Sequence, residues 1–242
     1  MINRMKHFSK FINAGLFVLV AVSTSCLSPS ETRITRTNTW GTVEPDLTNS
    51  NIYVRDDLDG ALIYNDKFKN FTPGNRAMIS YESVAEEAKK TGGEEYYFPA
   101  YVSKFEEIPL QELKSYSEIG ATDTFKFDPI EEFSVYQILS TTYQGKVPFC
   151  MEVTYSGTAQ THNLDLVYNS DVPWVDGDTI RFELRHDKKG DTGSTRQFVN
   201  YLSYNFKEVF KDKTSIVVDI AYNVVEGTGT SKKHYNFKWE KQ

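Results

Sequence analysis

The stretch Thr179-Ile-Arg-Phe-Glu-Leu-Arg185 decides the fold class of this chain. Its apolar residues Ile180, Phe182 and Leu184 alternate with polar ones, which is the two-residue period of a strand with one buried face. Residues 149–155 repeat the pattern. A strand with one apolar side must pack against a second layer. These stretches therefore predict a layered β structure.

Working outward from this stretch, the second half of the chain contains seven strand-like runs separated by turn residues. They lie at 133–139, 149–155, 163–168, 179–185, 197–206, 215–224 and 234–239. Seven short strands within 130–242 predict a β-sandwich of two sheets.

The first half has five such runs, all within residues 33–113. They lie at 34–43, 52–55, 61–64, 76–84 and 96–108. Five strands in so short a segment predict a small barrel of the OB type. Residues 114–129 are expected to connect the two domains, with a short helix within 110–117. The predicted fold class is all-β, a five-stranded OB-like barrel followed by a seven-stranded β-sandwich.

The N-terminus has the features of an export signal. Arg4, Lys6 and Lys10 are positive, residues 11–22 are mostly apolar, and small residues precede Cys26. This order predicts a signal peptide at 1–25. The apolar run is shorter than the roughly 20 residues of a membrane-spanning helix. Residues 26–32 are rich in Ser, Thr and Pro and would form a flexible tether.

The sequence Ser23-Thr-Ser-Cys26 resembles the bacterial lipoprotein box, in which the cysteine becomes the lipidated first residue. Ser23 departs from the leucine that is usual there. The resemblance implies a lipid on Cys26 and an anchor in the membrane. Leu27 is not the aspartate typical of inner-membrane retention, which favours the outer membrane, facing the periplasm or the exterior. The alternative is an ordinary signal peptide with a chance cysteine.

Charge and cysteine content restrict the partners. Removing residues 1–25 removes three positive charges, so the net charge of −6 becomes −9. The predicted barrel has 9 basic and 14 acidic residues and lacks the positive groove of nucleic-acid-binding OB domains. We therefore expect no nucleic acid partner. Cys150 lies in an apolar run and is predicted to be a small buried residue, without a disulfide partner if Cys26 is acylated.

Several motifs resemble those of the NigD-like lipoproteins of Bacteroidetes. In the second half they are Asn163-Leu-Asp-Leu-Val-Tyr-Asn169, Thr179-Ile-Arg-Phe-Glu-Leu-Arg-His-Asp187 with Gly190-Asp191, and Tyr235-Asn-Phe-Lys-Trp239. Tyr53-Val-Arg-Asp-Asp57 and Pro73-Gly-Asn-Arg76 match more loosely. The resemblance implies a lipobox, an OB-like domain and a β-sandwich, in that order. It implies no particular molecular activity.

Motifs that carry chemistry are few. No G-x-S-x-G, Walker or GxGxxG motif occurs. Residues 56–60 lack the spacing of an EF-hand and indicate a hairpin turn, and the charged loop 185–191 is interpreted in the same way. The histidines at 162, 186 and 234 lie on separate elements, without metal-ligand spacing, and are expected at the surface or at strand edges. We therefore predict no catalytic residue, metal or cofactor.

The aromatic residues supply the candidate contacts. A platform for sugars or peptides would draw on Trp40, Trp174, Trp239, Tyr96, Tyr97 and Tyr101. Trp239 lies on an alternating strand and is expected in the core, whereas Trp174 follows a proline in a turn and is the preferred ligand contact. The predicted function is a non-enzymatic binding or assembly module for an envelope protein or glycan. The alternatives are a hydrolase with an unrecognised site and a bacteriocin-immunity-type protein.

Overall fold

The computed structural model describes residues 31–118, 127–138, 143–158, 162–169, 171 and 174–240. The predicted signal peptide, Cys26 and most of the tether lie outside the described residues, as does part of the predicted connecting segment. Within the described ranges, no helix is both long enough and apolar enough to cross a membrane.

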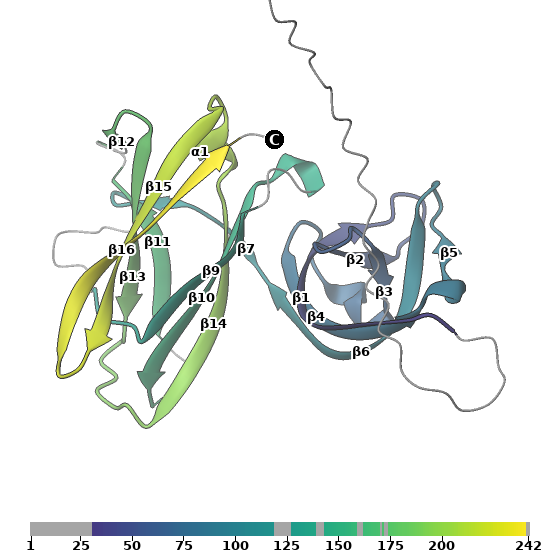
Figure 1. The fold of residues 1–242 in the computed structure, drawn as a ribbon, viewed down its shortest axis with the longest axis horizontal. Helices are drawn as coiled ribbons and strands as arrows, with labels where there is room; N and C mark the ends of the chain where they lie inside the picture. The colour runs from purple at the N-terminus through teal and green to yellow at the C-terminus, as the bar shows by residue number, and fades with distance from the viewer. Residues whose placement is uncertain are drawn as a thin grey trace, which may run out of the picture.

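The first half forms a closed five-stranded barrel, as predicted (Figure 1). Its strands are β1 (Arg33–Pro45), β2 (Ile52–Asp56), β3 (Leu62–Tyr64), β4 (Arg76–Val84) and β6 (Tyr96–Ile108). They follow the order β3-β2-β1-β4-β6, and a parallel pairing of β3 with β6 closes the barrel. The short helix η1 (Asp66–Asn70) buries Phe68 in the barrel core. Closure satisfies the backbone groups that an open sheet would leave at its edges.

Two loops meet at one end of the barrel. The β4–β6 connection contains η2 (Ala85–Glu87) and β5 (Lys89–Lys90). Gly92 in this connection donates its N–H to Asp46 Oδ2 in the β1–β2 loop at 3.3 Å, and a Cβ at Gly92 would overlap the Thr48 side chain. Although burial opposes ionisation, hydrogen bonds from Thr48, Gly92 and Tyr53 lower the pKa of Asp46 to about 2. OB domains commonly bind ligands between these two loops, and here the loops contact each other directly.

The second half is a β-sandwich that contains all seven predicted strands. One sheet has the order β7-β14-β10-β9, and the other has the order β16-β15-β13-β11-β8 with β12 beside β13. The bounds are β7 (Leu110–Glu112), β8 (Lys114–Ser115), β9 (Glu132–Ile138), β10 (Pro148–Gly157), β11 (Asn163–Tyr168), β12 (Trp174–Asp176), β13 (Thr179–Asp187), β14 (Arg196–Asn205), β15 (Ser215–Glu226) and β16 (Gly229–Glu240). Two short helices, η3 (Tyr143–Gly145) and α1 (Lys207–Phe210), lie in the connections.

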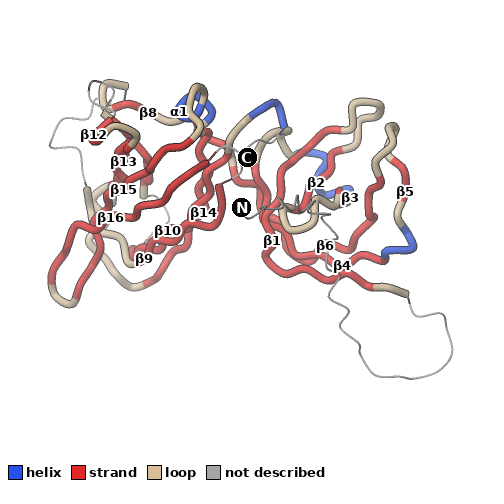
Figure 2. Tube along the Cα trace, turned by 45° about the horizontal axis from the view of Figure 1, so that its top comes forward, coloured by secondary structure: helices blue, strands red, loops and turns tan. Residues whose placement is uncertain are grey.

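The expectation of a short helix within 110–117 was wrong. This segment forms β7 and β8, which pair in parallel with β14 of one sheet and β11 of the other. Without this segment, the edges of β14 and β11 would have no partner there, and the chain leaving the barrel pairs with part of each edge. Figure 2 shows β8 within the strand-rich sandwich. Hydrogen bonding to the two sheets thus outweighs local helix propensity.

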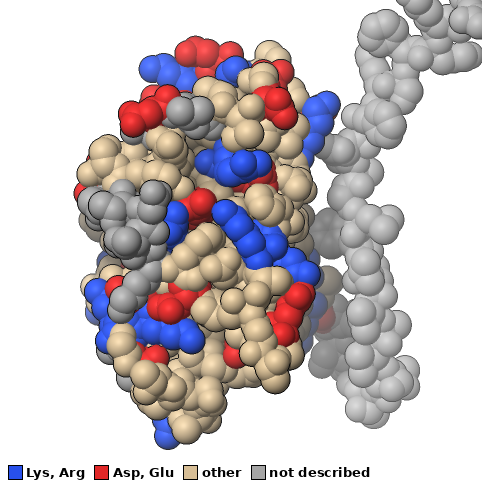
Figure 3. Space-filling model, turned by 90° about the vertical axis from the view of Figure 1, so that its left-hand side faces the viewer, with Lys and Arg blue, Asp and Glu red and all other residues tan. Residues whose placement is uncertain are grey.

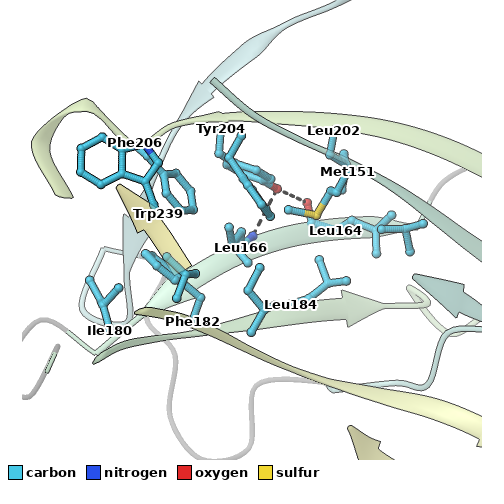
Figure 4. Close-up of a cluster of buried hydrophobic side chains, with 14 of the residues drawn as sticks. Met151, Leu164, Leu166, Ile180, Phe182, Leu184, Leu202, Tyr204, Phe206 and Trp239 are labelled. Atoms are coloured by element: carbon cyan, nitrogen blue, oxygen red, sulfur yellow. Dashed lines mark hydrogen bonds between the residues drawn. The ribbon is translucent and has the colours of Figure 1, made fainter. Parts of the chain in front are cut away.

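The core between the sheets is built from the alternating residues. Ile180, Phe182 and Leu184 of β13 are all buried, as the repeat predicted. Figure 4 shows them facing Tyr204 of β14, whose hydroxyl donates to Leu164 O and accepts from Leu166 N, each at 3.2 Å. A fully buried phenol hydroxyl thereby has both a donor and an acceptor partner. The predicted burial of Trp239 is confirmed, since its ring stacks on Phe210 at 4.1 Å.

The outward face of the larger sheet is covered with paired charges. Asp219 on β15 accepts from Arg181 Nε at 2.6 Å and contacts His234 Nδ1 at 2.8 Å. Figure 3 shows basic and acidic side chains interspersed over this side of the sandwich. Cross-strand pairs of opposite charge stabilise a solvated sheet face, so this surface is largely self-neutralised.

Candidate functional site

A shallow pocket of about 500 Å³ lies on the barrel, where β1, β4 and β6 run side by side. It is lined by Arg33, Glu82, Ser83, Val84, Glu87, Pro99, Ala100 and Tyr101. Cross-strand register creates it, because Arg33 pairs with Val84, and Glu82 pairs with Tyr101. The neighbouring Tyr81 and Val102 face the barrel core, so Glu82 and Tyr101 lie on the outer surface.

The pocket combines an exposed ring with charged groups. Tyr101 is 72% exposed, unusually high for an aromatic residue in the middle of a strand. Arg33 Nη1 donates to Glu82 Oε1 at 2.6 Å, which places a guanidinium and a carboxylate beside the ring. Glu87 adds a second carboxylate to the lining. This is the mixture of apolar surface and few polar groups that small-ligand sites use.

A buried ion pair lies at the junction of barrel and sandwich. Arg76 on β4 is fully buried and makes two hydrogen bonds with Asp57, one of them from Nη1 to Oδ1 at 3.1 Å, and a third with Thr42. Burial raises the pKa of Asp57, and Arg76 opposes that shift. The guanidinium also lies 6.0 Å from the Trp40 ring and beside the thiol of Cys150 on β10. The pair therefore lies where the two halves meet, and removing either partner would leave a buried charge unpaired.

Cys150 is fully buried, as predicted. Burial raises the pKa of its thiol, against the opposing effect of Arg76. Its Sγ lies 3.5 Å from Ser203 Oγ, and it packs with Trp40 and Met78 of the barrel. This residue is part of the junction core rather than a reactive thiol.

Aromatic rings surround the junction. Trp40 lies 5.7 Å from Tyr136 and 5.8 Å from Tyr201, measured between ring centroids. Tyr136 is half-exposed and donates its hydroxyl hydrogen to Glu152 at 2.8 Å, which raises the pKa of the tyrosine to about 12. Trp40 is thus a buried contact between the halves, and the exposed platform suggested for it is not formed.

The expectation that all three histidines lie at the surface was wrong for two of them. His162 and His186 are buried, with His162 Nδ1 and His186 Nε2 2.9 Å apart. His186 Nδ1 contacts Pro129 O at 3.0 Å, and His162 Nε2 contacts Asp191 Oδ2 at 3.2 Å. Tyr155 stacks on the His162 ring at 4.4 Å. The sequence contained an indication that His186 is buried, because the alternation along β13 places this residue on the same face as the inward-pointing residues of the strand.

The hydrogen-bond roles in this chain of contacts depend on the tautomers of the two rings. Pro129 O only accepts, so its hydrogen bond with His186 needs hydrogen on Nδ1. In a neutral ring, Nε2 of His186 is then the acceptor that faces Nδ1 of His162. Hydrogen bonds from the backbone of Thr158 and Gly193 lower the pKa of Asp191, which keeps this carboxylate ionised.

The remaining predicted residues are placed as follows. Trp174 on β12 is partly buried against the sandwich core, and Lys213 Nζ lies 4.3 Å from its ring. The turn at 56–60 is confirmed as the β2–β3 connection. Of the segment 185–191, predicted as a turn, residues 185–187 belong to β13 and only 188–191 lie in the turn, where the Lys189 N–H donates to Asp187 Oδ1. Across the described part of the chain, no group of three or more His, Cys, Asp or Glu is placed to hold a metal ion.

The fold and its junction define a class of protein, an OB-like barrel fastened to a β-sandwich. The family model of the NigD-like C-terminal beta sandwich domain matches residues 117–238, half of the chain. The chain therefore belongs to the NigD-like family. No curated protein matches its sequence.

Several solved structures of similar fold come from species of Bacteroides. A protein of unknown function from Bacteroides vulgatus has a TM-score of 0.59 at 17% identity, over 86% of this chain and 91% of that one. A NigD-like immunity protein from Bacteroides caccae has a TM-score of 0.53 at 15% identity, over 90% and 100%. A candidate lipoprotein from Bacteroides fragilis has a TM-score of 0.57 at 12% identity, over 87% and 99%. These likenesses show the fold.

Proposed function

We propose that this chain is a lipid-anchored lipoprotein of the outer membrane that acts as a non-enzymatic binding module. The observation that carries the proposal is the pocket around Tyr101, whose ring is 72% exposed between charged groups. In this proposal residues 33–113 form the binding domain and residues 130–242 form a sandwich that supports it, with 114–129 between them. The packing of buried Arg76 against Cys150 of the sandwich supports the idea, since it joins the barrel to the sandwich.

The proposed location at the membrane rests on the residues around Cys26. The signal-like segment 1–25 and the small residues before Cys26 support lipidation at that thiol. The candidate lipoprotein from Bacteroides fragilis, which has a similar fold, also supports this proposal of lipidation. One acyl-bearing cysteine and a short tether would hold the barrel close to the bilayer.

Replacing Cys26 by alanine should move the protein from the membrane pellet to the soluble fraction, because the thiol that carries the lipid is lost. Fractionation of cells followed by immunoblotting measures this. Ser28→Ala, two residues away, is the matched control and should stay in the pellet. A Cys26→Ala protein that still pellets with membranes would sink the proposed anchor.

Binding is tested with a photo-crosslinking amino acid at position 101 of the full chain in intact cells. We expect a specific adduct with an envelope protein or glycan from position 101. The same group at position 96, also an exposed tyrosine of β6 but outside the pocket lining, should give none. Equal adducts from both positions, or none from either, would contradict a binding module centred on this pocket.

A second candidate is an immunity-type protein, favoured by the name of the Bacteroides caccae relative. It predicts that deleting the gene sensitises the cell to a toxin of its own population. Unchanged sensitivity in a deletion strain removes this alternative.

A further inference from the structure

We infer that the pocket around Tyr101 binds a pyranose ring of a neutral oligosaccharide. This inference rests on the proposed function, because it names the class of ligand that the binding module takes. The shape of the pocket, its polar groups and its charge support this ligand class.

The apolar part of the pocket suits a sugar ring. Tyr101 presents its ring on the outer face of β6, the face that it shares with Pro99, and Val84 of β4 also lines the pocket. A pyranose has one face of C–H groups that packs on an aromatic ring, while its hydroxyls point outward to polar partners. The volume of about 500 Å³ lies within the range of about 300–1,000 Å³ typical of small-ligand sites.

The polar part supplies both kinds of hydrogen-bonding partner that hydroxyls need. Glu82 and Glu87 are carboxylates, which accept from sugar O–H groups, and Arg33 is a guanidinium, which donates to sugar oxygens. Arg33 and Glu82 hold each other in place at 2.6 Å. Pre-positioned side chains lose less conformational entropy when a ligand binds.

The charge of the pocket favours neutral sugars over acidic ones. Two carboxylates and one guanidinium line it, which gives an excess of one negative charge. A uronic acid or phosphorylated sugar would be repelled by the unbalanced carboxylate. A neutral hexose avoids this cost.

The strand pairing at the pocket shows where a peptide strand has room. An extended peptide binds most readily by adding a strand to an open sheet edge. The strand β4, which carries Glu82 and Val84, is paired on both edges, with β1 and with β6. The strand β1 pairs with β2 only over residues 41–45, so beside Arg33 its edge away from β4 is not covered by β2. Crosslinking at position 101 distinguishes a peptide partner at that edge from a sugar.

The pocket also lies close to the proposed anchor. Arg33 lies seven residues after Cys26, so the chain between them spans at most about 25 Å. A ligand held here would be a glycan at or near the membrane surface.

The test is a titration of the full lipidated chain in detergent with neutral tetrasaccharides, namely those of cellulose, starch, mannan and chitin. Oligogalacturonate is the acidic comparison. We expect saturable binding of at least one neutral probe by calorimetry and none of oligogalacturonate. Tyr101→Ala should weaken the affinity about tenfold or more, since the stacking surface is lost. Tyr101→Phe keeps the ring and should retain binding, and Tyr96→Ala is the matched surface control.

Failure to bind any neutral probe, or binding unchanged in Tyr101→Ala, would overturn the saccharide site. A protein adduct from position 101 in cells, without sugar binding, would overturn this inference and leave the binding module intact. Cleavage of a bound probe would retain the saccharide site and overturn the non-enzymatic function.

Discussion

Replacing Arg76 by methionine is expected to lower the free energy of unfolding by about 3–5 kcal/mol. Arg76 is fully buried and makes two hydrogen bonds with Asp57 and one with Thr42. Methionine fills similar space but leaves the Asp57 carboxylate, only 8% exposed, without its cation. An uncompensated buried charge is among the most destabilising defects in a protein. Urea unfolding followed by tryptophan fluorescence measures the loss, and Trp40 beside the pair reports on the junction itself.

The double variant Arg76→Met/Asp57→Leu provides the control. Removing both charges leaves no unpaired ion, so most of the lost stability should return. Arg33→Met serves as the surface comparison, because its ion pair with Glu82 is exposed and contributes about 0–1 kcal/mol. If Arg76→Met cost no more than Arg33→Met, the pair would not stabilise the junction as argued.

This pair also explains two sequence motifs that had no assigned role. Tyr53-Val-Arg-Asp-Asp57 and Pro73-Gly-Asn-Arg76 resemble family motifs. Their last residues, Asp57 and Arg76, are 19 positions apart in the sequence. The fold of the barrel brings Asp57 to Arg76, and the sandwich then covers both. The burial of such a charge pair beneath a neighbouring domain cannot be predicted from local periodicity, because it depends on which surfaces become covered in the folded chain.

Local pattern was sufficient where one face of a strand meets the core. The alternation of Ile180, Phe182 and Leu184 with polar residues correctly predicted a strand, the burial of one face and a layered fold. Such alternation follows directly from the geometry of a β-strand. It failed for 110–117, where the partners of β7 and β8 lie about 50 to 90 residues away. Contacts with distant strands decided that segment.

Only part of the candidate pocket could be predicted from the sequence. Tyr101 was one of six aromatic residues considered for a platform, and nothing local distinguished it from Tyr96. The distinction comes from register, which sets Glu82 opposite Tyr101 and lets Arg33 reach Glu82 across 49 positions of sequence. Trp174 was preferred as a contact because it follows a proline, but its ring packs partly against the sandwich core beneath Lys213.

Acid is expected to destabilise the sandwich through the buried histidine pair. Burial lowers the pKa of His186 below its ordinary 6.5, so the folded imidazole resists protonation. The unfolded chain takes up that proton as the pH falls below about 6.5 and so binds more protons than the folded chain. Stability therefore decreases with falling pH, by up to about 1.4 kcal/mol per pH unit for one proton. Urea unfolding at intervals between pH 7 and pH 5 measures the slope.

His186→Gln is the variant that isolates this effect. Glutamine does not titrate, and its amide can still donate to Pro129 O and accept from His162. The acid slope should therefore become shallower. His234→Gln, on the exposed face of β16, is the matched control and should keep the full slope. The other charged groups around His186 are Asp128 and Lys188, which oppose each other. If His186→Gln kept the wild-type slope, or if His234→Gln removed it, the buried His186 would not be the source of the acid sensitivity.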